Sequence, residues 1–182
     1  MHRPSPKPGR VVCLVGFMGA GKTTVGGLLA VRLKCRFVDL DREVEARERA
    51  AVAEIFSRTG QAAFRNAENE ALREVLALAL KEKKPLVLAL GGGAFVQPDN
   101  AARLEESQAI TIFLSAPAEE LWQRCQQAED AGVRPLLKDF AGFQRLYDQR
   151  LPYYRKCQWT VETGGRSPED VAAEIAARLA AS

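Results

Sequence analysis

Residues 16–24 carry the most specific chemical signature in this chain of 182 residues. Their sequence, GFMGAGKTT, fits the full pattern G-x-x-x-x-G-K-[ST] of a nucleotide-phosphate loop. In such a loop, glycines let backbone N–H groups turn toward the phosphates, the lysine reaches the β- and γ-phosphates, and the next hydroxyl ligates Mg²⁺. The predicted ATP-binding residues of the loop are Gly19, Ala20, Gly21, Lys22, Thr23 and Thr24.

The segments on either side of this loop favour the same interpretation over a glycine-rich turn with an incidental lysine. Residues 11–15 form a β-branched apolar run, as a buried parallel strand should, and apolar residues recur at helical spacing over 25–33. Strand, loop and helix therefore follow in the required order. The positive N-terminal end of the helix would face the phosphates.

Two carboxylates, Asp39 and Asp41, follow a short predicted strand over 36–38. Side chains alternate along a strand, so we expect both carboxylates to face one side at its C-terminal end. Open α/β sheets bind ligands at that end. A solvated turn with two acids is the alternative.

An arginine and an acid, Arg65 and Glu68, stand three residues apart in an amphipathic helix predicted over 61–81, where they are neighbours on one face. From spacing alone, a surface ion pair is the simplest interpretation. A buried strand over 85–90 then runs into Gly91, Gly92 and Gly93. Three glycines would let the backbone lie against a ligand where a Cβ would collide, or would form a plain turn.

A second arginine, Arg150, projects from an apolar helical stripe that includes Phe143 and Tyr147. Pro152 follows it and disfavours continuation of the helix. An arginine on an apolar face either binds an anion or extends its charged end to solvent. The sequence leaves both possibilities open.

The order of predicted elements indicates an α/β fold: a single three-layer domain with a parallel five-stranded sheet flanked by helices. Further helices are predicted over 42–58 (one or two, ended at 59–60), 99–106, 117–127 and 169–179, and further strands over 109–114 and 158–161. Three prolines make residues 1–9 a predicted disordered tail, which leaves 10–182 as the domain. Residues 128–140 lack a clean period and are predicted to form a mobile lid.

Composition excludes several classes of protein. The net charge of +3 is too balanced for a nucleic-acid surface, and no run of about 18 apolar residues suggests a membrane span. The four cysteines show no C-x-x-C spacing, so we expect them to be reduced in an intracellular protein. The basic N-terminus precedes an apolar run, but glycines interrupt that run and no cleavage site of a secretion signal follows.

Six motifs in order resemble those of the shikimate kinase family, which has a phosphate-loop kinase fold with a mobile lid. They are GFMGAGKTT, FVDLD, IF followed by FRNAE, LALGGG, RPLL and RLPYY, and together they extend over nearly the whole chain. The resemblance implies a cytoplasmic enzyme, which we expect to be a monomer. It would transfer the γ-phosphoryl of ATP to the 3-hydroxyl of shikimate, a step of aromatic amino acid biosynthesis, giving shikimate 3-phosphate and ADP.

The resemblance also implies a role for each matching residue. Lys22 and Thr23 would hold the ATP phosphates and Mg²⁺, with Asp39 near the metal, while Asp41 would orient the acceptor hydroxyl or act as base. Three more residues would bind the acceptor: Arg65, Gly92 and Arg150. Glu68 would fix the position of Arg65.

Two arginines complete the implied nucleotide side. Arg134, in RPLL, would be catalytic over the transferring phosphoryl group, and Arg166 would line the adenine side with Pro168. The chain departs from the family pattern in two ways. The stretch before Arg134 is longer, and glutamines stand at 126–127, where an adenine-stacking arginine is expected. Arg124 is the candidate to replace that arginine. A gluconate kinase and a nucleotide-binding regulator without turnover are the alternative functions.

Overall fold

A computed structural model describes residues 10–127 and 139–181. Five parallel strands form one sheet in the order β2-β3-β1-β4-β5. The strands are β1 Val11–Val15, β2 Arg36–Asp39, β3 Leu86–Ala89, β4 Ile110–Ser115 and β5 Trp159–Glu162. The helices are α1 Lys22–Leu33, α2 Leu40–Glu48, α3 Val52–Glu82, α4 Pro98–Glu106, α5 Ala118–Gln127, α6 Phe140–Tyr154 and α7 Pro168–Ala181.

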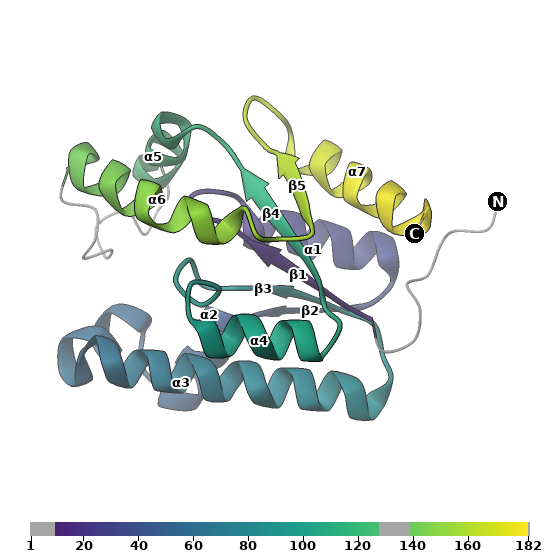
Figure 1. Cartoon of the computed structure of the whole chain (residues 1–182), viewed down its shortest axis with the longest axis horizontal. Helices are drawn as coiled ribbons and strands as arrows, with labels where there is room; N and C mark the ends of the chain where they lie inside the picture. Colours follow the sequence, from purple (N-terminus) through teal and green to yellow (C-terminus); the bar gives the residue numbers. More distant parts are fainter. Residues whose placement is uncertain (1–9, 128–138, 182) are drawn as a thin grey trace.

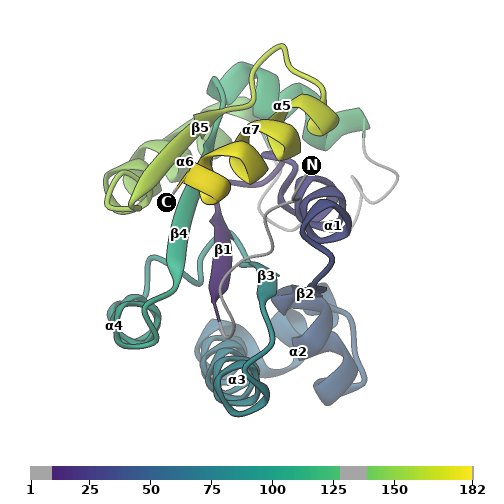
Figure 2. The same ribbon diagram turned by 90° about the vertical axis from the view of Figure 1, so that its right-hand side faces the viewer.

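The helices cover both faces of the sheet. Helices α1 and α7 pack together on one face, while α3 and α4 lie on the other (Figures 1 and 2). The central strand β1 is buried along its whole length, as expected for a parallel sheet covered on both sides. The predicted α/β fold with a parallel five-stranded sheet between helical layers is therefore confirmed.

Strand register brings the predicted chemical groups to one edge of the sheet. Ala89 at the end of β3 pairs with Leu14 of β1 on one side and with Asp39 of β2 on the other. All strands run the same way, so the phosphate loop, the acidic pair and the glycine segment all leave the sheet at its C-terminal edge.

The position of Asp41 differs from the prediction. Asp41 lies in the first turn of α2, not on a strand, so side-chain alternation does not govern its direction. The strand ends at Asp39 because the Asp39 carboxylate caps the helix and accepts the Asp41 backbone N–H at 3.1 Å.

Two helix breaks were predicted, and one is confirmed. Gly60 has non-helical dihedrals (φ 79°, ψ 173°) and separates a short first segment of α3 from its long amphipathic second segment. The expected stop before Pro152 is wrong, because α6 continues to Tyr154. Tyr154 is fully buried, packs against Phe113 and hydrogen-bonds the Gly92 carbonyl, which compensates for the backbone bond that proline removes.

The four cysteines, Cys13, Cys35, Cys125 and Cys157, are free thiols. Within residues 10–127 and 139–181, no helix has the length and apolar character needed to cross a membrane. The predicted tail (1–9) and most of the predicted lid (128–138) lie outside the described residues.

Candidate active site

The phosphate loop joins β1 to α1 in a conformation that needs glycine at two positions. Gly19 and Gly21 have φ of 80° and 81°, and a Cβ at Gly19 would lie 2.5 Å from the Leu121 carbonyl oxygen. The first turn of α1 contains no acidic residue of its own, and its N-terminal end carries the partial positive charge of a helix. Lys22 donates from Nζ to the carbonyl oxygens of Gly16 and Phe17, at 2.9 and 3.0 Å, and so lies folded along the loop.

A hydroxyl and a carboxylate meet beside this loop. Thr23 Oγ1 donates to Asp39 Oδ2 at 2.6 Å. Two hard oxygen groups suit Mg²⁺, which keeps several waters and takes other ligands from phosphates. The described ranges contain no cluster of three His, Cys, Asp or Glu side chains, so this site lacks the protein ligands of a closed metal cage.

The Asp41 carboxylate lies between the phosphate loop and α3. Its pKa is raised, first by burial and then by the charge of Asp39, while Lys22 and Arg65 lower it. These four charged groups therefore act on one another across a small, partly desolvated space. Such a shifted carboxylate is typical of a site that moves protons.

The three consecutive glycines lie against charged side chains of the site. A Cβ on Gly91 would collide with Asp41 Oδ1 and lie 2.8 Å from Glu68 Oε1, and a Cβ on Gly93 would collide with the Arg65 guanidinium. A Cβ on Gly92 would lie 3.4 Å from Arg150 Nη1, which is an ordinary contact distance. Gly91 and Gly93 thus make room for charged side chains from α2 and α3, and Arg150 of α6 lies beside Gly92.

The pair formed by Arg65 and Glu68 is buried, so the surface interpretation is wrong. Arg65 Nη1 and Glu68 Oε2 are 2.7 Å apart, and the two side chains are 17% and 0% exposed. Arg65 also lies near the rings of Phe56 and Phe64, at 6.0 and 5.2 Å from the centroids. This packing fixes the direction of its guanidinium.

Arg150 lies at the same site and does not extend along a free helical face. Its guanidinium carbon is 5.6 Å from the centroid of the Phe17 ring, in the phosphate loop. Burial raises the pKa of Tyr154 to about 12, and the nearby guanidinium groups of Arg150 and Arg65 oppose that rise. Among the described residues, no carboxylate forms an ion pair with Arg150. Arg65 and Arg150 thus both lie at the glycine segment. Of the two, only Arg65 forms an ion pair with an acidic residue, Glu68, among the described residues.

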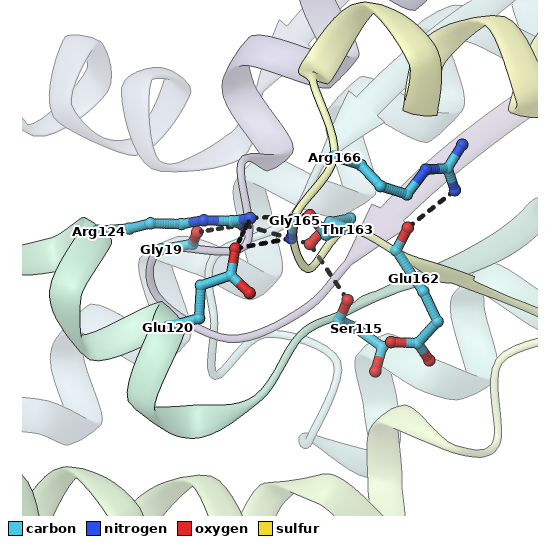
Figure 3. Close-up of polar contacts among 8 residues, drawn as sticks. All are labelled: Gly19, Ser115, Glu120, Arg124, Glu162, Thr163, Gly165 and Arg166. Carbon is cyan, nitrogen blue, oxygen red and sulfur yellow. Dashed lines mark hydrogen bonds and ion pairs between the residues drawn. The ribbon is translucent and has the colours of Figure 1, made fainter.

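On the other side of the phosphate loop, Arg124 of α5 connects three segments (Figure 3). It donates to Glu120 at 2.6 Å, to the Thr163 carbonyl at 2.8 Å and to the Gly19 carbonyl at 3.4 Å. Glu120 in turn accepts the Gly165 N–H at 3.0 Å. Arg124 therefore ties the phosphate loop to the turn that follows β5.

Arg166 behaves differently. Its Nη1 donates to the Glu162 carbonyl at 3.0 Å and to Glu174 Oε2 at 2.7 Å, so the side chain points away from Arg124 and the phosphate loop (Figure 3). Arg134 lies outside the described residues.

Comparison with known proteins identifies the family. A family model described as "Shikimate kinase" matches residues 18–180. The shikimate kinase of Geobacter metallireducens is 38% identical over 178 residues, which cover 96% of this chain and 94% of that protein. The chain belongs to the shikimate kinase family.

Solved structures agree with this assignment. A shikimate kinase from Acinetobacter baumannii, in complex with shikimate, superposes with a TM-score of 0.82 at 36% identity and covers 95% of this chain and 92% of that one. A gluconokinase from Sinorhizobium meliloti, at a TM-score of 0.62 and 19% identity, shares the fold; it covers 97% of this chain and 95% of that one.

For this member of the shikimate kinase family, sequence reasoning named most of the charged groups at the site but not their support. It assigned no role to Gln97, Asn100 or Tyr154, whose side chains bond Glu68, Ala94 and Gly92. Tyr154 ends the RLPYY motif, but the motif does not say what its phenol contacts, and a single amide such as Gln97 or Asn100 has no period or motif. Residue roles in binding and catalysis remain predictions.

The geometry of Arg124 and Arg166 allows a direct comparison of their roles. We expect Arg124→Ala to weaken ADP binding about tenfold, since it removes hydrogen bonds from a charged donor to the phosphate loop and to residue 163. Arg166→Ala should change ADP binding less than threefold, about 0.6 kcal/mol. Calorimetric titration of ADP into both variants measures this difference. A larger loss of ADP affinity in Arg166→Ala would instead support the predicted position of Arg166 on the adenine side of the nucleotide.

Proposed function

We propose that the chain is an ATP-dependent shikimate kinase that phosphorylates the 3-hydroxyl of shikimate. The observation that carries this proposal is the glycine segment at residues 91–93, which gathers Asp41, Arg65 and Arg150 beside a phosphate loop. A nucleotide-binding regulator needs no such second site. An acceptor that carries both a carboxylate and hydroxyl groups matches the charges gathered here.

The two arginines would hold the acceptor by its carboxylate. A guanidinium group matches a carboxylate with two parallel hydrogen bonds, and Arg65 is already oriented by Glu68. Arg150, with no acidic partner among the described residues, supplies the second positive charge. Held in this way, the acceptor ring would lie over Gly92 with a hydroxyl toward Asp41.

In the reaction, the acceptor oxygen forms a bond to the γ-phosphorus while the bond from that phosphorus to the β,γ-bridging oxygen breaks. The Asp41 carboxylate orients the hydroxyl and accepts its proton, a role that its raised pKa favours. Lys22 and the N-terminal end of α1 would hold the phosphates in line. Positioning and charge stabilisation supply most of the acceleration.

Thr23 and Asp39 fit Mg²⁺, because their oxygens meet at 2.6 Å beside the start of α1. When bound, the ion neutralises charge on the β- and γ-phosphate oxygens. We propose that Arg134 acts on the transferring phosphoryl group, on the strength of the RPLL motif. The remaining proposals, a monomeric state and a cytoplasmic location, come from the sequence; free cysteines fit a reducing compartment.

A coupled ADP-release assay tests the function. Shikimate should support turnover, whereas gluconate and a reaction without acceptor should give only background rates. Faster turnover with gluconate would favour the alternative sugar-acid kinase. ATP binding with no turnover on either acceptor would favour a regulator.

A further inference from the structure

The buried acid of the site, Glu68, receives a hydrogen bond from outside α3. Gln97 Nε2, at the start of α4, donates to Glu68 Oε2 at 3.0 Å, and Arg65 Nη1 donates to the same oxygen at 2.7 Å. The other oxygen, Oε1, has no hydrogen-bond partner in the described part of the chain and faces Gly91. One carboxylate oxygen therefore carries both contacts that fix this side chain.

Glu68 needs such support because its surroundings disfavour a charge. Burial raises the pKa of Glu68 and the charge of Asp41 adds to the rise, whereas Arg65 and Gln97 oppose it. Without the Gln97 amide, a single contact would hold the carboxylate. The carboxylate would then turn or take up a proton more readily, and either change loosens its hold on Arg65.

The segment that carries Gln97 is itself fastened to α3. Asn100 Nδ2 donates to the Ala94 carbonyl at 3.0 Å, and Asn69 Nδ2 donates to Asn100 Oδ1 at 3.0 Å. Asn100 is fully buried. Two amide contacts, at neighbouring positions 68 and 69 of α3, thus set the place of Gln97 relative to the site.

We propose that Gln97 is a positioning residue: through Glu68 it sets the direction of the Arg65 guanidinium and so the affinity for the acceptor carboxylate. This inference rests on the proposed function, because it takes the acceptor to be shikimate. The Gln97 side chain donates to Glu68, the partner of Arg65, and so acts on the acceptor side of the site.

Two substitutions distinguish a role of the Gln97 side chain as a hydrogen-bond donor from a role in packing. Gln97→Met removes the donor at similar size, and Gln97→Glu keeps the shape but places a second carboxylate against Glu68. We expect Gln97→Met to raise the KM for shikimate about 5- to 20-fold, as for one hydrogen bond to a charged group acting through a second residue. Gln97→Glu should raise it further, about 50-fold or more, because it repels Glu68 and competes for Arg65. In both variants, kcat and the KM for ATP should stay within about threefold of the wild type, under 0.7 kcal/mol.

Gln144 offers a matched control on an exposed part of α6, where its amide donates to Asp148 at 2.9 Å. Gln144→Met and Gln144→Glu repeat the same chemical changes away from the glycine segment and should leave all three constants unchanged. Melting temperatures of all variants report whether each protein is folded.

Several results would overturn the inference. A packing role predicts Gln97→Glu close to wild type, since glutamate has the shape of glutamine. Equal rises in the KM for ATP and for shikimate, or a fall in melting temperature without a change in KM, would also make Gln97 a structural residue. If the wild-type protein turns over shikimate and the Gln97 variants have an unchanged KM for shikimate, only this inference is wrong. If the wild-type protein does not turn over shikimate, the proposed function is wrong as well.

Discussion

Replacing Asp41 by asparagine is expected to lower kcat by about two to four orders of magnitude, the usual scale for a positioned acid or base. Asparagine keeps the size of the side chain and can still orient a hydroxyl, but it cannot accept the proton that the acceptor loses. ATP affinity should stay near that of the wild type, because Lys22 and Thr23 keep their hydrogen bonds to the loop carbonyls and to Asp39.

The same variant should be more stable at neutral pH. Because burial raises the pKa of Asp41, its ionisation disfavours the folded state once pH exceeds the ordinary value of 3.8. Asparagine removes that unfavourable charge, so the melting temperature should rise at neutral pH. The gain should shrink as pH falls through the raised folded-state pKa, and it should be lost below pH 3.8, where the wild-type carboxyl is protonated in both states.

Steady-state kinetics and thermal melts between acid and neutral pH check both effects. Asp148→Asn is the control, because Asp148 is exposed on α6, where its carboxylate accepts a hydrogen bond from Gln144. Near-normal turnover in Asp41→Asn would remove Asp41 from the catalytic assignment. Lower stability at neutral pH would show that its charge is held by favourable contacts instead.

The order and type of elements follow from the sequence because each depends on local pattern. The apolar run of β1 and the glycines before Lys22 define strand and loop without any distant contact. Gly60 likewise marks the break in α3. The start of α2 is local too, because the Asp39 carboxylate caps this helix two residues before Asp41. Local reasoning fails where a tertiary contact decides: buried Tyr154 extends α6 past Pro152.

The candidate site, like the fold, could be predicted from the sequence only in part. Residue types at the site could be predicted because phosphates, metals and carboxylates each require particular partners. Their burial could not, since spacing three residues apart gives Arg65 and Glu68 the same pattern on a surface as in a core. The role of Gly91 and Gly93 also required the structure, because the side chains they admit come from two separate helices, α2 and α3.

Replacing Arg150 by alanine is expected to raise the KM for shikimate sharply and to leave ATP affinity nearly unchanged. Loss of one charge-assisted contact in a desolvated site costs on the order of 2 to 4 kcal/mol, which corresponds to a factor of about 30 to several hundred. Arg150 contacts the ring of Phe17 and lies near Gly92, but no phosphate-loop group that would hold ATP depends on it.

The matched control is Arg145→Ala, which removes the same side chain from an exposed position on α6. An analogue with a neutral carboxamide in place of the carboxylate gives a second measurement. Wild-type protein should discriminate strongly between shikimate and this analogue, whereas Arg150→Ala should discriminate poorly, because half of the charge-sensing pair is gone.

A double-mutant cycle with Arg65→Ala then decides whether the two arginines act on one group. If both bind the same carboxylate, their effects on the KM for shikimate should be non-additive. Additive effects would place them on separate parts of the acceptor. An unchanged KM in Arg150→Ala with a lower melting temperature would make this arginine a structural partner of Phe17, and the predicted specificity for a carboxylate would then depend on Arg65 alone.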